Sequence, residues 1–346
     1  MKKIILVGID LAKTVLRINC VNENGKRVEN RNLHRDSVIR FFATLPECTV
    51  AMEACASSHY WGRRIESLGH TVKLIHPLYV KPFRLGDKND ANDAAAICAA
   101  ATRPDMRFVQ LKTQRQSDIQ ALHRARNGLI KERTATINRV RAMLAENGIV
   151  IKQGAAAVFS ILPGAIDDEN NELSCTMRRI LGSQYQHLLH LNEQITGFDK
   201  DIKKLAVEEE DCKRLMQIPG LGPITATLLV AEIGNGVSFR NSRSLAAYMG
   251  LVPKQFSSGG KNKLFGIGKR GNAQLRTLFV HCARSVLRAM SFGKFPFGGD
   301  TEKWIFALME RSGKNKTIVA LAAKLARIAW SILVRGTNFQ VASVAP

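Results

Sequence analysis

The N-terminal part of the chain has the short-period pattern of β-strands. Residues 3–9 form an apolar run that suits a buried strand, and residues 14–21 alternate before the polar turn at 22–25. A third strand over 26–33 completes a meander. A helix over 36–45, a strand over 49–53, a helix over 58–68, a strand over 71–75 and a further helix are expected next. This order predicts a mixed α/β sheet with functional residues at the strand ends.

The middle of the chain has helical spacing of its apolar residues. One helix is expected from about 117 to 146 and another from about 173 to 207. Residues 148–172 between them are rich in Gly and Ala and contain Pro163-Gly164, which predicts a loop with short turns. The long helices are consistent with a coiled-coil arm used in dimerisation or with a compact helical subdomain.

The last part of the chain opens with the Gly-x-Gly segment at 218–226, which suggests a helix-hairpin-helix turn. Glycines there would let backbone amides approach a phosphate, and the next helix N-terminus adds a favourable dipole. Helices are expected over 223–234, 242–249, 272–290, 301–311 and 315–334, interrupted by a basic loop at 254–271. We therefore expect domains at 1–112, 113–210 and 211–346, the last mainly α.

The net charge of the chain indicates what kind of partner it binds. The chain carries 51 Lys and Arg against 29 Asp and Glu, a net charge of +22. The excess is 6 in residues 1–103 (16 basic, 10 acidic), 1 in 104–210 (15 and 14) and 15 in 211–346 (20 and 5). A polyanion such as DNA or RNA is the expected partner, since phosphate neutralisation gives strong, salt-sensitive binding. A ribosomal or membrane-surface protein could be equally basic.

The sequence also indicates a compartment. The apolar run at the start is too short for a secretory signal, and no apolar stretch approaches the ~20 residues of a membrane span. The seven cysteines are odd in number and contain no CxxC pair, which favours reduced thiols over disulfides or zinc ligands. We expect a cytoplasmic protein.

Four carboxylates are candidates for a metal site. Asp10 and Glu53 end predicted strands, and Asp90 and Asp93 share one face at the start of an Ala-rich helix. If the strands are neighbours, the carboxylates converge, and divalent cations would relieve their repulsion. Two Mg²⁺ ions could then clamp the attacking and leaving oxygens of a phosphodiester. Each residue also has an ordinary explanation, as a helix cap, a first-turn charge or a solvated strand end.

These residues lie in motifs that resemble the insertion-sequence one-ten family of DEDD transposases, and within it the eleven-eleven branch. The matching segments begin with Gly8–Lys13, Met52–Cys55, His59–Trp61, Gly69–Val72, Pro77 with Tyr79–Phe83, Lys88–Ala94 and Arg103–Val109. They continue with Pro219–Gly222, Gly250–Pro253, Ser258–Gly260 and Gly268–Asn272. The likeness covers nearly the whole chain and is weakest in 150–210.

The resemblance implies an α/β RuvC-like (RNase H-like) N-terminal domain, a long helical coiled-coil linker and a mainly α C-terminal transposase domain. Asp10, Glu53, Asp90 and Asp93 would hold Mg²⁺, as two ions, with Mn²⁺ as an alternative. Ser258 would attack a DNA phosphate and form a phosphoserine link. The implied partners are donor and target DNA, a structured noncoding bridge RNA that selects the sites, and further copies of the chain, up to a tetramer whose active sites join different protomers. The resemblance also implies a bacterial or archaeal, nucleoid-associated protein with no membrane partner.

Without the resemblance, Ser258 lies in a flexible turn where serine is usually a turn former. Ser257 is its neighbour, and no histidine in the adjacent loop could activate either hydroxyl, which favours activation by a metal centre. Basic residues, interleaved with Phe256 and Phe265, are expected to contact phosphates and stack bases. The candidate nucleic-acid ligands are Lys254, Lys261, Lys263, Lys269, Arg270 and Arg276 near the serine, and Lys81, Arg84 and Lys88 ahead of the aspartate pair.

We therefore expect a recombinase that cuts and rejoins DNA. Three alternatives remain open from the residues. A RuvC-like structure-specific nuclease would use the same carboxylates and water, a site-specific invertase would use the same chemistry on another substrate arrangement, and a noncatalytic scaffold would bind nucleic acid only.

Overall fold

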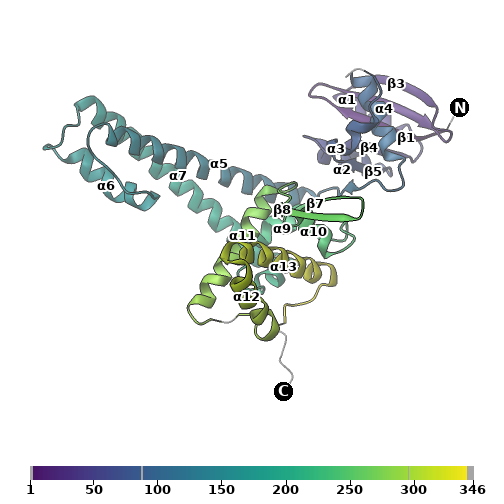
Figure 1. Cartoon of the computed structure of the whole chain (residues 1–346). Coiled ribbons are helices and arrows are strands. Elements are labelled where there is room, and N and C mark those ends of the chain that lie inside the picture. Colours follow the sequence, from purple (N-terminus) through teal and green to yellow (C-terminus); the bar gives the residue numbers. More distant parts are fainter. Residues whose placement is uncertain (1–2, 87–88, 295, 341–346) are drawn as a thin grey trace. The chain divides into compact units, whose positions relative to one another are not determined.

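The structure is a computed structural model that describes residues 3–86, 89–294 and 296–340 (Figure 1). The chain divides into two compact units, Met1–Arg115 and Gln116–Pro346. The first contains a mixed sheet with helices, and the second is mostly helical. The expected α/β region followed by a helical region is confirmed at this level.

The sheet of the first unit has the order β3-β2-β1-β4-β5-β6. β1, β2 and β3 form an antiparallel meander, β4 and β5 run parallel to β1, and β6 pairs antiparallel with β5. The strands are β1 (Ile4–Leu11), β2 (Val15–Asn22), β3 (Arg27–His34), β4 (Thr49–Glu53), β5 (Thr71–Ile75) and β6 (Phe108–Val109). This topology is consistent with the RNase H-like domain that the resemblance implies. Only the short β6 was not expected from the sequence.

Helices cover both faces of this sheet. α1 (Arg35–Ala43) and α2 (Ser58–Glu66) share a core with one face, where Phe42 and Ile65 are fully buried. α4 (Asp90–Ala101) shares a core with the opposite face. The short α3 (Pro77–Val80) and the 3₁₀ helix η1 (Lys81–Phe83) lead towards α4. Because side chains alternate along a strand, β1, β2, β4 and β5 each contribute residues to both cores.

Two long antiparallel helices begin the second unit, as Figure 1 shows. They are α5 (Gln114–Ala145), whose first two residues belong to the first unit, and α7 (Cys175–Glu208). Arg133 Nη1 donates to Asn192 Oδ1 at 2.8 Å, and Arg139 Nη1 donates to Gln184 Oε1 at 3.0 Å. The helices are therefore antiparallel, because the residue number increases along α5 as it decreases along α7.

The prediction of a loop between these helices is wrong. A helix, α6 (Ala155–Asp167), occupies most of it, with Pro163 inside. Val158 and Leu162 are fully buried with apolar residues of α5 and α7. Tertiary burial and the helix-forming Ala155–Ala157 run outweigh the Pro-Gly pair that predicted a break.

The remaining helices surround one apolar core. They are α8 (Glu210–Met216), α9 (Pro223–Ile233), α10 (Ser242–Tyr248), α11 (Ala273–Ser291), α12 (Gly299–Ser312) and α13 (Lys314–Arg335). Among the described helices, α13 alone is long and apolar enough to cross a membrane. Its buried apolar residues, including Leu321, Leu325 and Ala329, belong to this core, which accounts for its apolar composition.

The prediction of a basic loop at 254–271 is also wrong in part. A β-hairpin replaces most of it, formed by β7 (Pro253–Ser258) and β8 (Lys261–Ile267). Gly259 and Gly260 form the connection with φ values of +55° and +77°. Such a pair of positive φ angles matches the twist of a tight hairpin, and glycine adopts them without steric cost.

Candidate active site

Asp10 and Glu53 lie on neighbouring parallel strands. The register of β1 and β4 pairs Ile9 with Met52, one residue before the two carboxylates. Ile9 and Met52 are buried in the α1/α2 core, and Ala51 in the α4 core. Alternation therefore directs Asp10 and Glu53 to the α4 face. Both side chains are partly buried.

A glycine lets α4 approach these strands. A Cβ built on Gly8 would lie 2.5 Å from the carbonyl oxygen of Ala94 and 2.6 Å from Cys98 Sγ. The start of α4 is held by Asn89, whose Oδ1 accepts the Asn92 backbone N–H at 2.8 Å. Asn89 is thus the N-cap, rather than Asp90. This arrangement places the first turn of α4, with Asp93, beside the carboxyl end of β1.

Electrostatics link three of the four carboxylates. The pKa of Glu53 is raised by burial first, then by the negative charges of Asp10 and Asp93, while Arg84 lowers it. Arg84 Nη1 lies 3.4 Å from Asp93 Oδ1, and both side chains are partly buried. Asp90, the first residue of α4, is exposed. The charges of Asp10 and Asp93 therefore act on Glu53, whereas Asp90 is exposed and is not among the charges that shift its pKa.

These residues fit a divalent cation by chemistry. Within the described ranges, no group of three or more His, Cys, Asp and Glu side chains is placed so that it could hold a metal ion. The fit rests instead on the mutual repulsion at Glu53, which a hard cation would relieve, and on carboxylate oxygens, the donors that Mg²⁺ prefers. In this structure the Arg84 guanidinium supplies part of that positive charge.

Ser258 and Ser257 lie on opposite faces of the hairpin. Ser257 pairs across the strands with Asn262, and Gln255 Nε2 donates to Ser257 Oγ at 2.8 Å and to Asn262 Oδ1 at 3.3 Å. Ser258 pairs with Lys261, and two residues further Phe256 pairs with Lys263. Cross-strand partners share a face, so Ser258 is on the face with Lys261, Lys263 and Phe256.

The face carrying Ser258 is open to solvent. Ser258, Lys261 and Lys263 are all exposed, and the Phe256 side chain keeps 71% of its surface exposed. An aromatic ring beside two ammonium groups is a suitable surface for a base and its phosphates. The hairpin therefore places Ser258 on the face with the Lys261 and Lys263 side chains, and Ser257 beside the side-chain amides of Gln255 and Asn262.

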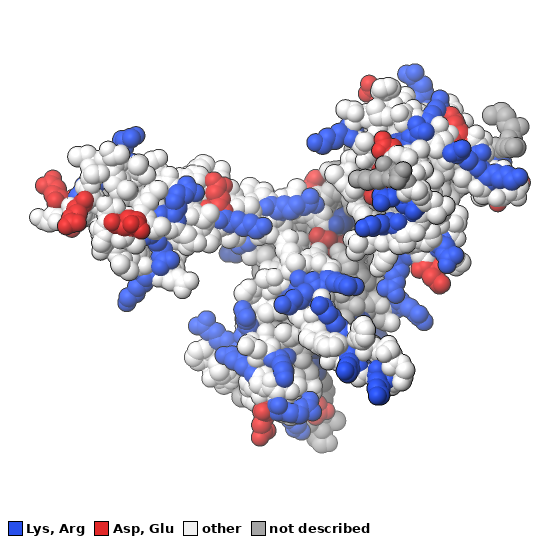
Figure 2. Space-filling view, turned by 45° about the horizontal axis from the view of Figure 1, so that its top comes forward, with Lys and Arg blue, Asp and Glu red and all other residues white. Residues whose placement is uncertain are grey.

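The other predicted nucleic-acid ligands differ in their surroundings. Lys254, Lys269, Arg270 and Lys81 are exposed. Arg276 Nη1 donates to the Met249 carbonyl at 3.0 Å, so part of its hydrogen-bonding capacity is used within the fold. Arg84 is paired with Asp93, and Lys88 lies outside the described residues. Figure 2 shows many basic side chains on the visible face of the protein.

The Gly-x-Gly turn has a packing role that the sequence did not indicate. It connects α8 to α9, with Gly222 as the cap of α9 and Pro223 in its first turn. Gly220 has a φ of +84°, and a Cβ there would lie 2.7 Å from the Cys282 carbonyl of α11. Gly220 is therefore required for close packing, and only Gly222 is free of such a neighbour within 4 Å.

Comparisons with known proteins agree with this arrangement. A family model described as "Transposase", of the DEDD type in the IS110 group, matches residues 7–148, and one described as "Transposase IS116/IS110/IS902 family" matches 212–295. The chain is 40% identical to the transposase for insertion sequence element IS1328 of Yersinia enterocolitica, over 98% of this chain and 99% of the relative. It is 41% identical to the IS1111A transposase of Coxiella burnetii, over 98% and 92%.

The chain belongs to the IS110 family of transposases. The resemblance inferred from the motifs, including the eleven-eleven branch, is thereby confirmed. The transposase is an enzyme that recombines DNA. A more distant relative, the pilin gene-inverting protein of Moraxella bovis, is 27% identical over 82% of this chain and 80% of its own length.

The two family matches divide the predicted site residues between them. The first includes Asp10, Glu53, Asp90 and Asp93, and the second includes the hairpin with Ser258. Gly8, which positions α4, was not singled out from the sequence. A glycine inside a strand pattern indicates close approach of another backbone, so the pattern itself could have identified it.

Proposed function

We propose that this transposase cuts and rejoins DNA through a phosphoserine intermediate at Ser258, with Mg²⁺ held by Asp10, Glu53 and Asp93 and by Asp90 at the edge of the cluster. The observation that carries the proposal is the convergence of Asp10, Glu53 and Asp93 on the α4 face of the sheet. Bound Mg²⁺ would polarise the phosphodiester and stabilise charge on the attacking and leaving oxygens.

The chain's own residues account for bond exchange. Ser258 Oγ forms a bond to phosphorus while the bond from phosphorus to one strand oxygen breaks, and the serine proton leaves as that oxygen becomes a hydroxyl. Glu53 is a proposed ligand of the cation and would be ionised there, so we assign no residue as the base: the serine proton passes to solvent, and the departing oxygen takes up a proton from solvent. In the second half, a hydroxyl of the joining strand attacks the phosphoserine and restores Ser258. Phosphodiester energy is kept throughout, so no nucleotide cofactor is needed.

Ser258 is favoured over Ser257 by its surroundings. The ammonium groups of Lys261 and Lys263 on its face favour an approaching phosphate, whereas the Ser257 hydroxyl is engaged by Gln255. The test is to incubate DNA with the transposase and Mg²⁺ and to search for a serine-linked DNA adduct. Ser258→Ala should abolish the adduct and Ser257→Ala should retain it. The opposite result would move the nucleophile to Ser257, and cleavage that persists in Ser258→Ala, with no adduct from any variant, would favour a water nucleophile.

The partners follow from the family and the charge. We propose that a structured bridge RNA selects the donor and target DNA, and that the chain acts as a tetramer in which the carboxylates and Ser258 of one active site come from different copies. The excess of 15 basic side chains in residues 211–346 supports nucleic-acid binding. Purifying the transposase from cells that carry its element, and sequencing RNA that copurifies, tests the RNA partner.

Inversion is a second candidate function. The relative named as a pilin gene-inverting protein aligns over most of the chain. Inversion and transposition differ in how the two DNA sites are arranged, whereas the same residues could perform both. A plasmid with two sites in inverted orientation would distinguish them, since an invertase flips the intervening segment.

A further inference from the structure

A hollow on the second unit is lined by residues outside the Ser258 hairpin. It has a volume of about 520 Å³ and is formed along one side of α13, with Ser242 of α10 and Trp304 of α12 on its borders. From α13 it is lined by Lys324, Arg327 and Ser331, among others. We call it the α13 groove.

The α13 groove has a continuous helical floor. Ala320, Lys324, Arg327 and Ser331 recur at spacings of three and four residues, so they form one stripe on α13. Ala320 and Ala323 have small side chains, so they leave space on the helix surface beside the charged groups of Lys324 and Arg327. A strand of a polymer could therefore lie along the helix within reach of both positive groups.

The two cations repel each other. Lys324 Nζ donates to Thr301 Oγ1 at 3.1 Å and lies 4.8 Å from the centre of the Trp304 ring. Its pKa is lowered by burial first and by the charge of Arg327 second. In the residues that the structure covers, neither Lys324 nor Arg327 has an ion pair with a carboxylate. An anion between them would relieve this repulsion.

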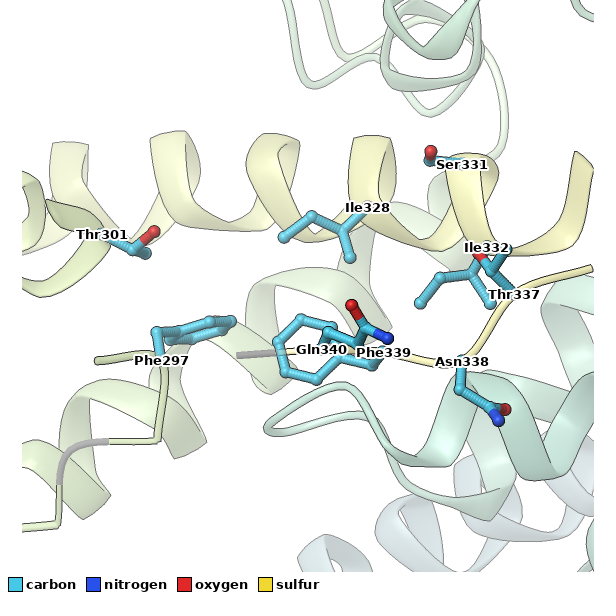
Figure 3. A pocket seen from close by; sticks show the side chains of 9 residues that line it. All are labelled: Phe297, Thr301, Ile328, Ser331, Ile332, Thr337, Asn338, Phe339 and Gln340. Carbon is cyan, nitrogen blue, oxygen red and sulfur yellow. The ribbon is translucent and has the colours of Figure 1, made fainter. Parts of the chain in front are cut away.

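The polar border of the groove also favours an anion. The hydroxyl groups of Ser242 and Ser331 can both donate hydrogen bonds. A second hollow of about 310 Å³ provides a contrast, since it lies along α13 too but is lined by Phe297, Phe339 and neutral residues only (Figure 3). The charge that would select an anion is therefore confined to the α13 groove.

We propose that the α13 groove binds the phosphodiester backbone of a nucleic-acid strand, with Lys324 and Arg327 on phosphate oxygens and Ser242 and Ser331 as further donors. The site is separate from the Ser258 hairpin and does not require the proposed covalent chemistry. The ligand class follows from the donors and from the family's action on DNA. A DNA strand and an RNA strand carry the same phosphodiester, so the experiment must distinguish them.

The test measures binding of the full chain to a short DNA duplex and to a single-stranded RNA, by fluorescence anisotropy across a salt series with a chelator present. Variants Arg327→Gln and Lys324→Gln are compared with Lys314→Gln and Arg335→Gln, exposed residues at the two ends of the same helix. Each lost phosphate contact should lower the salt slope by roughly 0.9 on duplex DNA or roughly 0.7 on single-stranded RNA.

A lower slope for the groove variants on DNA alone assigns the groove to DNA, and on RNA alone to RNA. Lys324→Arg should preserve the slope, because it keeps the charge. Since Arg327 is exposed, its replacement tests the groove without disturbing the core. The proposal is overturned if neither slope changes, or if the control variants lower both slopes equally. Either result leaves the Ser258 adduct experiment unaffected.

Discussion

Gly8 in β1 lies directly against Ala94 in α4, and a Cβ on Gly8 would stand 2.5 Å from the Ala94 carbonyl oxygen. Asp93 precedes Ala94, and Asp10 is two residues beyond Gly8 on the same strand face. The close approach of helix and strand therefore sets the separation of two carboxylates of the candidate site. A residue without a side chain is thus as important to the cluster as the residues that form it.

Gly8→Ala should impair both stability and activity. The added methyl group must push α4 away from β1, because both atoms it meets at the helix are fixed in a packed core. Overpacking of this kind costs roughly 1–3 kcal/mol. Urea unfolding measures the loss, and strand transfer should fall further than stability alone explains.

Gly182→Ala is the matched control. Gly182 is inside α7, has open space around its Cα, and has no positive φ angle. Alanine there should stabilise the helix by roughly 0.5–1 kcal/mol. If Gly8→Ala proved as well tolerated as this control, the close approach of α4 to β1 would not exist in solution.

Glu53→Gln should distinguish the repulsion among the carboxylates from the stabilisation by bound Mg²⁺. Without divalent ions the variant should melt at a higher temperature than the parent, because the replacement removes a partly buried charge that Asp10 and Asp93 repel. With Mg²⁺ the order should reverse, since ligand binding stabilises only a protein that retains the site. Thermal melting with a chelator and with excess Mg²⁺ measures both.

In the presence of Mg²⁺, strand transfer should be lost in Glu53→Gln. Glu47→Gln provides a control carboxylate on the same unit, before β4, and should respond to Mg²⁺ as the parent does. An equal rise in melting temperature with Mg²⁺ for parent and Glu53→Gln would show that the ion binds elsewhere.

The sequence allowed the first unit to be predicted in more detail than the second unit. β4 and β5 have the predicted bounds, because short apolar runs between helices favour buried parallel strands. The pattern predicted that Asp10 and Glu53 end strands, but it left open whether these strands are neighbours, which the register of β1 and β4 shows. The N-cap was not predicted either, since Asn89 and Asp90 are both suitable cap residues and only the geometry of the first turn distinguishes them.

The hairpin and α6 were missed for different physical reasons. Residues 253–267 are nearly all exposed, so their sequence lacks the alternation of apolar and polar residues that marks a half-buried strand. The turn is specified by the positive φ angles at Gly259 and Gly260. In α6, the Pro163-Gly164 pair indicates a break, but packing of Val158 and Leu162 keeps the helix. The opposite faces of Ser257 and Ser258 depend on hairpin register, which only the structure provides.

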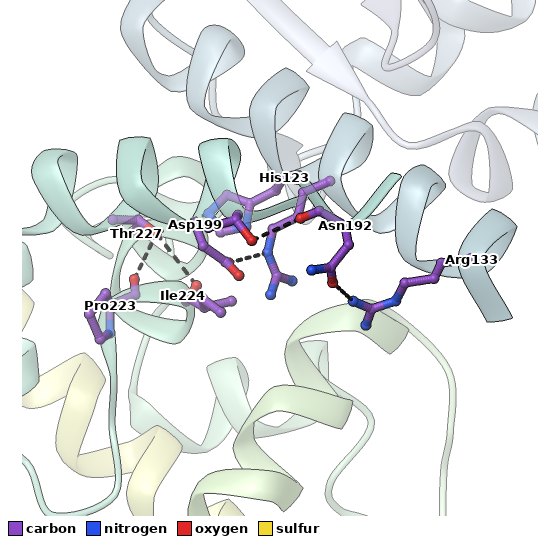
Figure 4. Close-up of polar contacts among 9 residues, drawn as sticks. His123, Arg133, Asn192, Asp199, Pro223, Ile224 and Thr227 are labelled. Carbon is purple, nitrogen blue, oxygen red and sulfur yellow. Dashed lines mark hydrogen bonds and ion pairs between the residues drawn. The ribbon is translucent and has the colours of Figure 1, made fainter. Parts of the chain in front are cut away.

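The stability of the second unit should depend on the protonation of His123. This residue of α5 is 1% exposed, and its Nε2 lies 2.9 Å from Thr227 Oγ1 of α9 (Figure 4). The Thr227 hydroxyl donates to the Pro223 carbonyl at 2.8 Å, so we assign the hydrogen between them to His123 Nε2. Burial first, and Arg126 second, lower the pKa of His123 to about 4.

The neutral imidazole is therefore favoured in the folded state. An unfolded histidine has a pKa of about 6.5, so the unfolded chain binds more protons between these values. The full stability is present above pH ~6.5 and falls as the pH decreases towards 4, by about 3 kcal/mol in total. Urea unfolding at a series of pH values should show this slope, and His123→Gln should reduce it. An unchanged slope in the variant would assign the dependence to other groups.

Mixing two inactive variants tests whether an active site joins residues from different copies. Asp10→Asn removes a carboxylate from the first unit, and Ser258→Ala removes the hydroxyl from the second. If each site takes its carboxylates from one copy and its serine from another, some sites in a mixed oligomer contain an intact set of both. Coexpression of the two variants should then restore part of the strand transfer, while each variant alone remains inactive.

The control mixture combines Asp10→Asn with Glu53→Gln. Both changes affect the same acidic cluster, so no exchange of copies can assemble an intact cluster, and activity should stay absent. Differently tagged copies should copurify in both mixtures, which establishes that mixed oligomers form. Should the first mixture stay as inactive as the control despite copurification, the carboxylates and Ser258 of each site must come from one copy, because every intact combination across copies would have been available.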